Sequence, residues 1–412
     1  MSLKRKSFRY LIAPSNASVR DKLVADVILS GTADQTIINA ALVTYGNVEI
    51  ASGNVSTTGP ISIIGIPGGS GTDSPTFQLR GQGKHSTIIS SASNINTIEL
   101  TSDPSVIIEN IHLKPLGSGH GIKSTAYTGG SPIPYRSFWM SSFENLFIEG
   151  DSTHTGYALY LEGLFRSTFK NIDGLGIANG MYMSASNSAF NPGNCSFDRM
   201  FFDIKIANGK GFYFYTPDTG GQLNILKLSQ CEAIDSSGTS TTSIGMHFRG
   251  SATQYYATKN IFIDSSNLEG FNNAVFFEHS ISNRCSFNYL NCKTGGTLVK
   301  FSADSYNNTV EILSSYIPVS ETYVIVNDAN TNTSQPNIIK GLEAYADTSS
   351  TVNVTTTPAT VFEGMGITGP GTIAVAIANR SRDASKTTLT SANGTKYKVT
   401  VSDAGVLTTT SV

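Results

Sequence analysis

The chain has 412 residues, enough for two or three ordinary domains or for one repeat domain with caps. Only 14% of its residues are charged, while it contains 39 Gly, 21 Phe and 17 Tyr, a mixture that favours strands and turns over helices. The net charge of −2, without a block of like charges, excludes nucleic acid as the main partner. No stretch approaches the ~18 apolar residues of a membrane span, and the first residues lack the apolar core of a Sec signal peptide, so we expect neither.

The first 45 residues are predicted to form an N-terminal segment and cap. Residues 34–42 place apolar side chains at helical spacing, which predicts a short helix. A helix at this point would cover the open strand edge of the β-structure that follows.

Residues 46–315 contain a repeated phrase of the form apolar, polar, Asn, apolar, any, apolar. Its clear copies begin at Ile108, Phe143 and Phe169, and looser copies begin at residues 197, 223, 258 and 287. Successive copies therefore begin 26 to 35 residues apart, a period typical of a solenoid. The alternation of apolar residues changes parity at the Asn, which indicates a sharp bend between two strands, and a second alternating phrase supplies a third strand.

The repeat therefore predicts an all-β fold, a right-handed single-stranded parallel β-helix with three strands per coil. Stacked coils would place the Asn side chains in a hydrogen-bonded ladder and the apolar residues in an internal column. A β-sandwich array is the alternative, and it fits less well because Asn-Gly turns are rare between residues 100 and 310.

The segment before the repeat carries a family resemblance. Leu79-Arg80-Gly81-Gln82-Gly83, preceded by the predicted helix and followed by Thr87-Ile88-Ile89, resembles the entry segment of the pectate-lyase-like superfamily. In that superfamily a short helix caps the first coil. The resemblance implies architecture rather than chemistry, because one fold supports many functions.

The second phrase of the repeat places one outward residue on each coil. Four of these are candidate substrate-binding residues: Tyr160, Tyr182, Tyr213 and His247. A column of rings at ~4.8 Å steps could follow an extended polysaccharide, since aromatic faces and phenol edges suit sugar rings. The same column could instead lie between subunits or under long turns. Trp139, the only Trp, lies in the longest early turn and is a fifth candidate.

Catalytic carboxylates are harder to identify from sequence. Glu162 is the best candidate because it follows Tyr160 on the same face, and Asp151 and His154 lie in the turn before that strand. Such a coil could assemble an acid, a base and a ring, although an ordinary solvated Glu is the more frequent outcome. The four cysteines lack metal spacing and are expected to be reduced, and we expect no metal and no cofactor.

Residues 316–349 are predicted to be the last coils or a linker, and residues 350–412 a small C-terminal β domain, because turn signals divide a Thr/Val-rich sequence. The ending 394–410 resembles the terminal hairpins of bacteriophage tail fibres and tailspikes. That resemblance implies a homotrimer, trimerised by the C-terminal domain and located on a virion tail or outside the cell after lysis.

Three functions follow as hypotheses. The leading one is a tailspike-like or tail-fibre-like receptor-binding protein that recognises, and in one version depolymerises, a host cell-surface polysaccharide. The alternatives are a stand-alone polysaccharide-degrading enzyme, either a glycoside hydrolase or a lyase, and a purely structural fibre or adhesin. The sequence names neither the glycan nor the bond that would be cleaved.

Overall fold

The structure is a computed structural model that is 62% strand and 6% helix, which confirms the predicted all-β class. It describes residues 9–65, 76–101, 105–125, 138–185, 193–217, 221–238, 241–252, 258–317, 322–330, 332, 334–356, 360–364, 366–368, 372–377, 388–390, 396–401 and 407–411. The chain divides into two compact units, which are described separately: an N-terminal unit of residues 1–206 with 219–223, and a C-terminal unit of residues 207–218 with 224–412.

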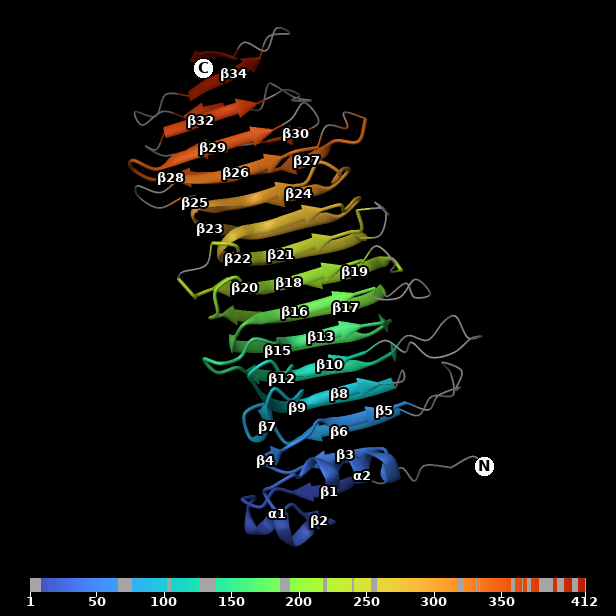
Figure 1. Cartoon of the computed structure of the whole chain (residues 1–412). Coiled ribbons are helices and arrows are strands. Elements are labelled where there is room, and N and C mark those ends of the chain that lie inside the picture. Colours follow the sequence, from blue (N-terminus) through green and yellow to red (C-terminus); the bar gives the residue numbers. More distant parts are fainter. Residues whose placement is uncertain are drawn as a thin grey trace. The chain divides into compact units, whose positions relative to one another are not determined.

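The N-terminal unit is a stack of short strands that pair in parallel from one coil to the next (Figure 1). Its strands are β1 (Tyr10–Ala13), β2 (Val27–Ile28), β3 (Asn47–Ile50), β4 (Gly53–Thr57), β5 (Ile61–Ile64), β6 (Thr76–Gly81), β7 (Thr87–Ser93), β8 (Ile98–Thr101), β9 (Ser105–Leu116), β10 (Ile122–Ser124), β11 (Phe138–Trp139), β12 (Ser142–Glu149), β13 (Tyr157–Glu162), β14 (Leu164–Phe165), β15 (Thr168–Ile177), β16 (Asn179–Ser184) and β17 (Gly193–Ile204). The pairs β3–β6, β4–β7 and β5–β8 are each parallel and define three strands per coil, so the unit is a parallel β-helix as predicted.

The bend in each repeat lies at the Asn, as the sequence predicts. Asn110, Asn145 and Asn171 have φ angles of 61°, 54° and 54°, in the left-handed region that Asn tolerates better than most residues. Asn145 Nδ2 donates to Asn110 Oδ1 at 3.1 Å, and Asn171 Nδ2 donates to Asn145 Oδ1 at 2.5 Å. The ladder therefore ties consecutive bends together.

Inside the coils, equivalent apolar residues stack on one another. Phe143 stacks on Phe169 and Phe169 on Phe197, with ring centroids 4.5 and 4.8 Å apart. All three rings are fully buried, and offset stacking of this kind adds to the free energy of burial. The glycine of the entry motif is also explained, because a Cβ on Gly81 would collide with the carbonyl oxygen of Asn110.

Two helices lie at the start of the chain. Helix α2 (Gln35–Tyr45) is the predicted plug, and it extends three residues past the predicted end to stop at Gly46, whose φ is 73°. Its buried residues are Ile38, Ala41 and Leu42, and it contacts β3 and β5. Helix α1 (Val19–Val24) was not predicted, because it buries no residue and so shows no apolar periodicity.

The C-terminal unit continues with parallel coils. Its strands are β18 (Lys210–Tyr215), β19 (Leu223–Ser229), β20 (Glu232–Asp235), β21 (Ile244–Arg249), β22 (Thr258–Glu278), β23 (Arg284–Phe301), β24 (Thr309–Ile312), β25 (Ser315–Ile317), β26 (Thr322–Asp328), β27 (Asn337–Lys340), β28 (Glu343–Ala346), β29 (Thr351–Thr356), β30 (Thr360–Glu363), β31 (Gly366–Thr368), β32 (Thr372–Ile377), β33 (Thr388–Thr390), β34 (Lys396–Val401) and β35 (Leu407–Ser411). Stacked Phe214, Phe248, Phe277 and Phe301 fill its interior.

Parallel pairing runs further along the chain than residue 349, the end predicted for the coils. β29 pairs in parallel with β26, β32 with β29 and β33 with β31, which brings the parallel pairing to Leu389. Antiparallel pairing is found only in β33–β34 and β34–β35 among the described strands. The later coils escape sequence detection because they are rich in Thr and Val and lack the Asn phrase.

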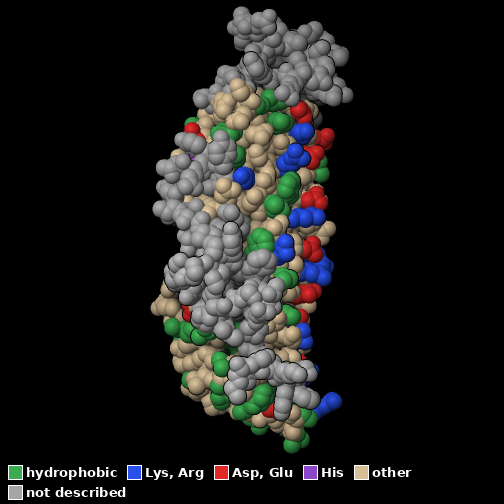
Figure 2. Space-filling view, turned by 90° about the vertical axis from the view of Figure 1, so that its right-hand side faces the viewer, with side chains coloured by type: hydrophobic (Ala, Val, Ile, Leu, Met, Phe, Trp, Pro, Cys, Tyr) green, Lys and Arg blue, Asp and Glu red, His purple; other side chains and the backbone are tan. Residues whose placement is uncertain are grey.

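Charged residues follow one another along the coils of the N-terminal unit. Glu49, Arg80 and Glu109 occupy one register position, and Arg80 Nε lies 2.9 Å from Glu109 Oε1. Figure 2 shows acidic and basic side chains side by side along the right-hand edge of the view. Their alternation avoids like charges on adjacent strands, which would be destabilising.

The four cysteines are all buried free thiols, as expected. No helix in the described part of the chain is long and apolar enough to cross a membrane.

Candidate functional site

The predicted outward column is in register within each unit. In the N-terminal unit, Lys123 pairs with Tyr160 and Tyr160 with Tyr182 on β10, β13 and β16. In the C-terminal unit, Tyr213 pairs with His247 and His247 with Phe276 on β18, β21 and β22. The rings of each group stack, because equivalent side chains on adjacent parallel strands are only about 4.8 Å apart.

This stacking limits how Tyr160 can meet a sugar. Its ring centroid lies 4.5 Å from that of Tyr182 on one face and 4.8 Å from that of His120 on the other. A saccharide ring between two aromatic rings needs roughly 7–8 Å, since each contact takes about 3.5–4 Å. The faces of Tyr160 are therefore closed to a sugar, and only its phenol edge is available.

Glu162 is held at that edge. Tyr160 Oη donates to Glu162 Oε1 at 3.2 Å, and the backbone N–H of Glu162 donates to Ser124 Oγ at 2.9 Å. Burial is the largest cause of a raised pKa for Tyr160, so its phenol stays protonated and donates to the carboxylate. Tyr157, a ring that the sequence analysis missed, contacts both Tyr160 and Tyr182.

Asp151 and His154 do not join Glu162. Asp151 is exposed and its Oδ1 accepts from the backbone N–H and the hydroxyl of Thr153. It precedes β13 while Glu162 ends that strand, and six extended residues separate the two ends by about 17 Å. Glycoside hydrolysis needs carboxyl groups about 5–9.5 Å apart, so this pair does not fit the chemistry predicted for it.

His154 has a structural role. It is fully buried, its Nε2 lies 3.1 Å from the carbonyl oxygen of Gly119, and its Nδ1 accepts from the backbone N–H of Ala178 at 3.1 Å. Burial lowers its pKa, so the neutral imidazole links three successive coils. The side chain of Trp139 lies outside the described atoms, and its backbone pairs with Phe165.

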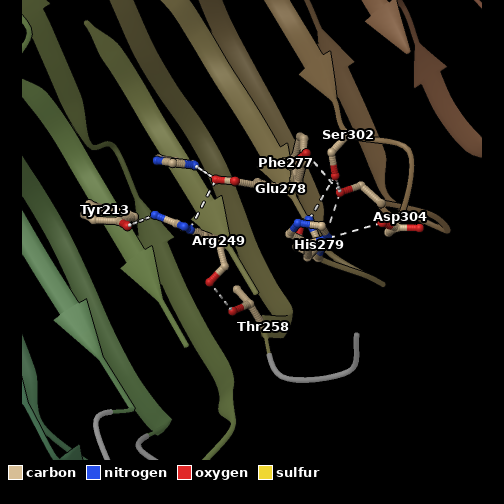
Figure 3. Close-up of polar contacts among 11 residues, drawn as sticks. Tyr213, Arg249, Thr258, Phe277, Glu278, His279, Ser302 and Asp304 are labelled. Carbon is tan, nitrogen blue, oxygen red and sulfur yellow. Dashed lines mark hydrogen bonds and ion pairs between the residues drawn. The ribbon is translucent and has the colours of Figure 1, made fainter. Parts of the chain in front are cut away.

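The more elaborate cluster lies in the C-terminal unit, where Figure 3 shows Tyr213, Arg249 and Glu278 together. His247 Nε2 donates to Glu278 Oε2 at 2.9 Å, and Arg249 Nε lies 3.4 Å from the same oxygen. Arg249 Nη1 also donates to Tyr213 Oη at 3.5 Å. We call Lys210, Tyr213, His247, Arg249 and Glu278 the Arg249 cluster.

Tyr213 and His247 are the buried floor of this cluster. They are only 7% and 4% exposed, and their ring centroids are 4.8 Å apart. The other face of Tyr213 is covered by Lys210 Nζ at 3.4 Å from the ring centroid, and that of His247 by Phe276 at 5.0 Å. The sequence analysis proposed that both rings stack on a sugar, but both faces of each ring are covered. The two side chains instead position Arg249 and Glu278, and the Arg249 side chain is 44% exposed.

The protonation states follow from burial and neighbouring charge. Burial lowers the pKa of His247 to about 4, so the imidazole is neutral, and the hydrogen bond from it lowers the pKa of Glu278, which stays ionised. His247 Nδ1 is buried without a hydrogen-bond partner among the described atoms. Burial, followed by repulsion from Arg249, lowers the pKa of Lys210 to about 8.

A second group in Figure 3 contains the residue types of a catalytic triad but not its bonding. Ser302 Oγ accepts from the backbone N–H of His279 at 3.0 Å, while His279 Nδ1 lies 3.4 Å from Asp304 Oδ2. Ser302 Oγ also lies 3.0 Å from Ser305 Oγ, which donates to the carbonyl of Phe277. The described contacts fix a turn and do not activate a serine. No group of His, Cys, Asp and Glu that could hold a metal occurs among the described residues.

No protein-family model matches the sequence, and no curated protein sequence matches it either. Among solved structures, the Azotobacter vinelandii mannuronan C-5 epimerase AlgE6 A-module is similar with a TM-score of 0.50 and 12% identity, over 84% of this chain and 93% of that one. The AlgE4 A-module of the same organism has a TM-score of 0.36 and 12% identity over 84% and 92% of the two chains. Geobacillus virus E2 ORF18 has a TM-score of 0.33 and 14% identity over 93% and 74%. The first likeness shows a shared fold, and the other two are too weak to carry an argument.

Proposed function

We propose that this chain is a receptor-binding protein of the phage tailspike or tail-fibre type, which binds a host cell-surface polysaccharide on the outer face of its coils. The observation that carries the proposal is the Arg249 cluster, in which two buried polar rings hold a partly exposed guanidinium and carboxylate at the surface. Burying polar groups to fix a surface pair is costly for folding alone, which favours a binding role.

The charges of the cluster favour an anionic glycan. Lys210 and Arg249 lie near a single carboxylate, that of Glu278, and Lys300 lies over the ring of Phe276 on the next strand of the column. A guanidinium binds a sugar carboxylate through two parallel hydrogen bonds, which gives both affinity and orientation. The phenol of Tyr160 and the carboxylate of Glu162 offer a further polar edge in the N-terminal unit.

Binding of anionic oligosaccharides tests this proposal. We expect the wild-type chain to bind glycans that carry uronic acids on an array, and Arg249→Met to weaken that binding by about tenfold to a hundredfold, the range for lost charge-assisted hydrogen bonds. Arg284→Met, which removes an exposed arginine at the start of β23, is the matched control. Unchanged binding by the Arg249 variant would contradict the proposal.

A second candidate function is an enzyme that modifies the same polysaccharide. Lys210 is the observation that favours it, because an amine with a pKa of about 8 is poised to accept a proton near neutral pH. Glu278 has a lowered pKa and no described carboxylate partner in the cluster, so it is a poor general acid for hydrolysis. The cluster suits proton abstraction next to a carboxylate better than glycoside hydrolysis.

In that chemistry, Arg249 would hold the sugar carboxylate while the neutral amine of Lys210 takes the proton from the adjacent carbon. The electron pair left behind can form a carbon–carbon double bond as the glycosidic C–O bond breaks, which is elimination. It can also take a proton back on the opposite face, which is epimerisation. One solved protein of this fold is named for such an epimerisation, although a shared fold does not assign an activity.

Solvent-exchange NMR separates these outcomes. Elimination produces an unsaturated, shorter sugar, whereas epimerisation in D₂O labels one carbon without cleavage. Lys210→Met should abolish either reaction and retain glycan binding. If the wild-type chain binds a glycan but neither cleaves nor labels it, the receptor-binding function stands and the enzymatic one is wrong.

A further inference from the structure

A second aromatic pair lies on a different sheet of the C-terminal unit. Tyr316 on β25 and Tyr345 on β28 are in register, and these strands belong to the smaller sheet, separate from the one that carries the Arg249 cluster. Their rings are nearly parallel, with centroids 6.0 Å apart and an interplanar angle of 12°. Unlike Tyr213, these two tyrosines are 39% and 46% exposed.

The hydroxyl edge of this pair is fixed by an acidic residue. Tyr316 Oη donates to Asp347 Oδ2 at 2.8 Å, and Asp347 Oδ1 accepts from the backbone N–H of Thr348 at 2.6 Å. Both carboxylate oxygens therefore have defined partners, and the ring of Tyr316 keeps one orientation. A ring held in place loses less conformational entropy when it binds a ligand.

The surroundings select the kind of ligand. Leu313, three residues before Tyr316 in the chain, is exposed and apolar, and Glu343 on the same strand as Tyr345 is exposed and acidic. Two acidic groups and no described basic group on β25 or β28 would repel a sugar carboxylate. The 6.0 Å spacing closes the facing sides of the two rings to a sugar, so it is their exposed outer parts and the hydrogen-bonding edge that suit the C–H groups and hydroxyl rim of an uncharged sugar.

We propose that Tyr316, Tyr345 and Asp347 form a second saccharide-binding surface, which takes uncharged sugar units. The inference rests on the proposed function in that it assumes a polysaccharide target, but it needs no residue of the Arg249 cluster. The protein would then hold two chemically different parts of a glycan on two sheets of its coils, an anionic unit on one and a neutral unit on the other.

Titration calorimetry of the full chain with maltohexaose, chitohexaose and an oligomannuronate tests the surface. We expect at least one of the two uncharged oligosaccharides to bind, and Tyr316→Ala and Tyr345→Ala each to weaken that binding by about tenfold. Tyr316→Phe keeps the ring and removes the bond to Asp347, so a smaller loss is expected. Phe262→Ala, which removes an exposed ring on β22, should bind like the wild type.

The outcomes separate this surface from the Arg249 cluster. The tyrosine variants should leave oligomannuronate binding unchanged, and Arg249→Met should leave binding of the uncharged sugar unchanged. If neither uncharged oligosaccharide binds, or if the tyrosine variants bind like the wild type, the proposed surface is wrong. A changed sedimentation coefficient of Tyr345→Ala would also overturn it, because the pair would then be a subunit contact. If the tyrosine variants alone fail to weaken binding, the proposed function is unaffected. If Arg249→Met alone fails to weaken binding, this surface is unaffected.

Discussion

Asn145 shows how one residue can serve both a bend and a stack. Its φ of 54° lets the chain turn between two strands, and its side-chain amide bonds the equivalent Asn on the coils before and after it. An alanine could satisfy neither need, because its Cβ disfavours the left-handed region and it has no amide.

We therefore expect Asn145→Ala to lower the free energy of unfolding by about 2–3 kcal/mol, through backbone strain of about 1–2 kcal/mol and the lost ladder bonds. Asn145→Gly relieves the strain but not the bonds, so it should cost about 1 kcal/mol. Urea denaturation of both variants measures the difference. Equal losses for the two would show that the left-handed backbone contributes nothing.

Lys210 gives a prediction for the pH dependence of any turnover. Its pKa is lowered from the ordinary lysine value to about 8, mainly by burial. Only the neutral amine can accept a proton, and about a tenth of Lys210 is neutral one unit below its pKa, so the rate should rise with pH and level off above it. Lys210→Arg stays protonated throughout and should be inactive at every pH while retaining binding.

The initial-rate profile of the wild type between about pH 6 and pH 10 measures this dependence. A profile that is flat or falls with rising pH would show that Lys210 is not the base. The binding affinity of Lys210→Arg, determined in parallel, controls for loss of the site itself.

Residue types could be predicted at the candidate site, but their roles could not. The alternating phrase placed Tyr160, Tyr182, Tyr213 and His247 on one outward column, and register pairing within each unit agrees. Sequence gives a direction for each side chain but not what covers its faces, and stacking closes the rings that seemed open. The buried His247 and the cation over Tyr213, which fix Arg249 and Glu278, are visible only in three dimensions.

At the scale of elements, helix α2 caps the N-terminal end of the coils. Leu42 is 1% exposed within it, whereas its neighbour Val43 points outward and is exposed. The helix contacts β3 and β5; β5 has only β8 as a described strand partner, so its other edge would otherwise be open to strands of other molecules.

Leu42→Ala should therefore destabilise the N-terminal unit by about 2–4 kcal/mol, the usual range for a large-to-small change in a core. Val43→Ala, next to it on the same helix, should change the free energy of unfolding by less than about 0.5 kcal/mol. Thermal denaturation with light scattering checks both quantities. We expect the Leu42 variant to aggregate at a lower temperature. Equal denaturation and aggregation temperatures for the two variants would contradict the capping role of α2.

Elements were predictable where they carry a periodic signal. The Asn phrase located the bends and the coils because an αL residue and alternating apolar residues leave a pattern in sequence. The buried Asn283–Asn308–Asn337 ladder of the C-terminal unit, with Nδ2 to Oδ1 distances of 3.0 and 3.1 Å, was missed. Asn283 and Asn308 are followed by Arg284 and Thr309 instead of an apolar residue, so they do not fit the repeated phrase.

At the scale of the whole molecule, the open end of the coils needs a cover. The described parallel pairing reaches β33, which pairs in parallel with β31, and the antiparallel strands β34 and β35 follow it in the chain. The ending of the chain resembles the terminal hairpins of phage tail proteins, and we propose that these strands join three copies of the chain. The domain boundaries that the sequence predicts at residues 315 and 349 stay predictions. The strand pairing suggests that a truncation further along the chain, after residue 377, is also needed to test the trimer.

Two truncations separate capping from trimer contacts. Removing residues 378–412 takes away β33 to β35 and, of the described parallel pairs, only β31–β33, whereas removing residues 350–412 also takes away β29, β30, β31 and β32. If the antiparallel strands hold the trimer, both truncated chains should sediment as monomers or aggregate, and the wild type as a trimer. Circular dichroism controls for folding, since the shorter deletion should retain the strand signal of the coils. A soluble trimer after loss of residues 378–412 would place the subunit contacts in the coils. In that case only the longer deletion, which removes paired strands and exposes β26, β27 and β28, would change the oligomeric state.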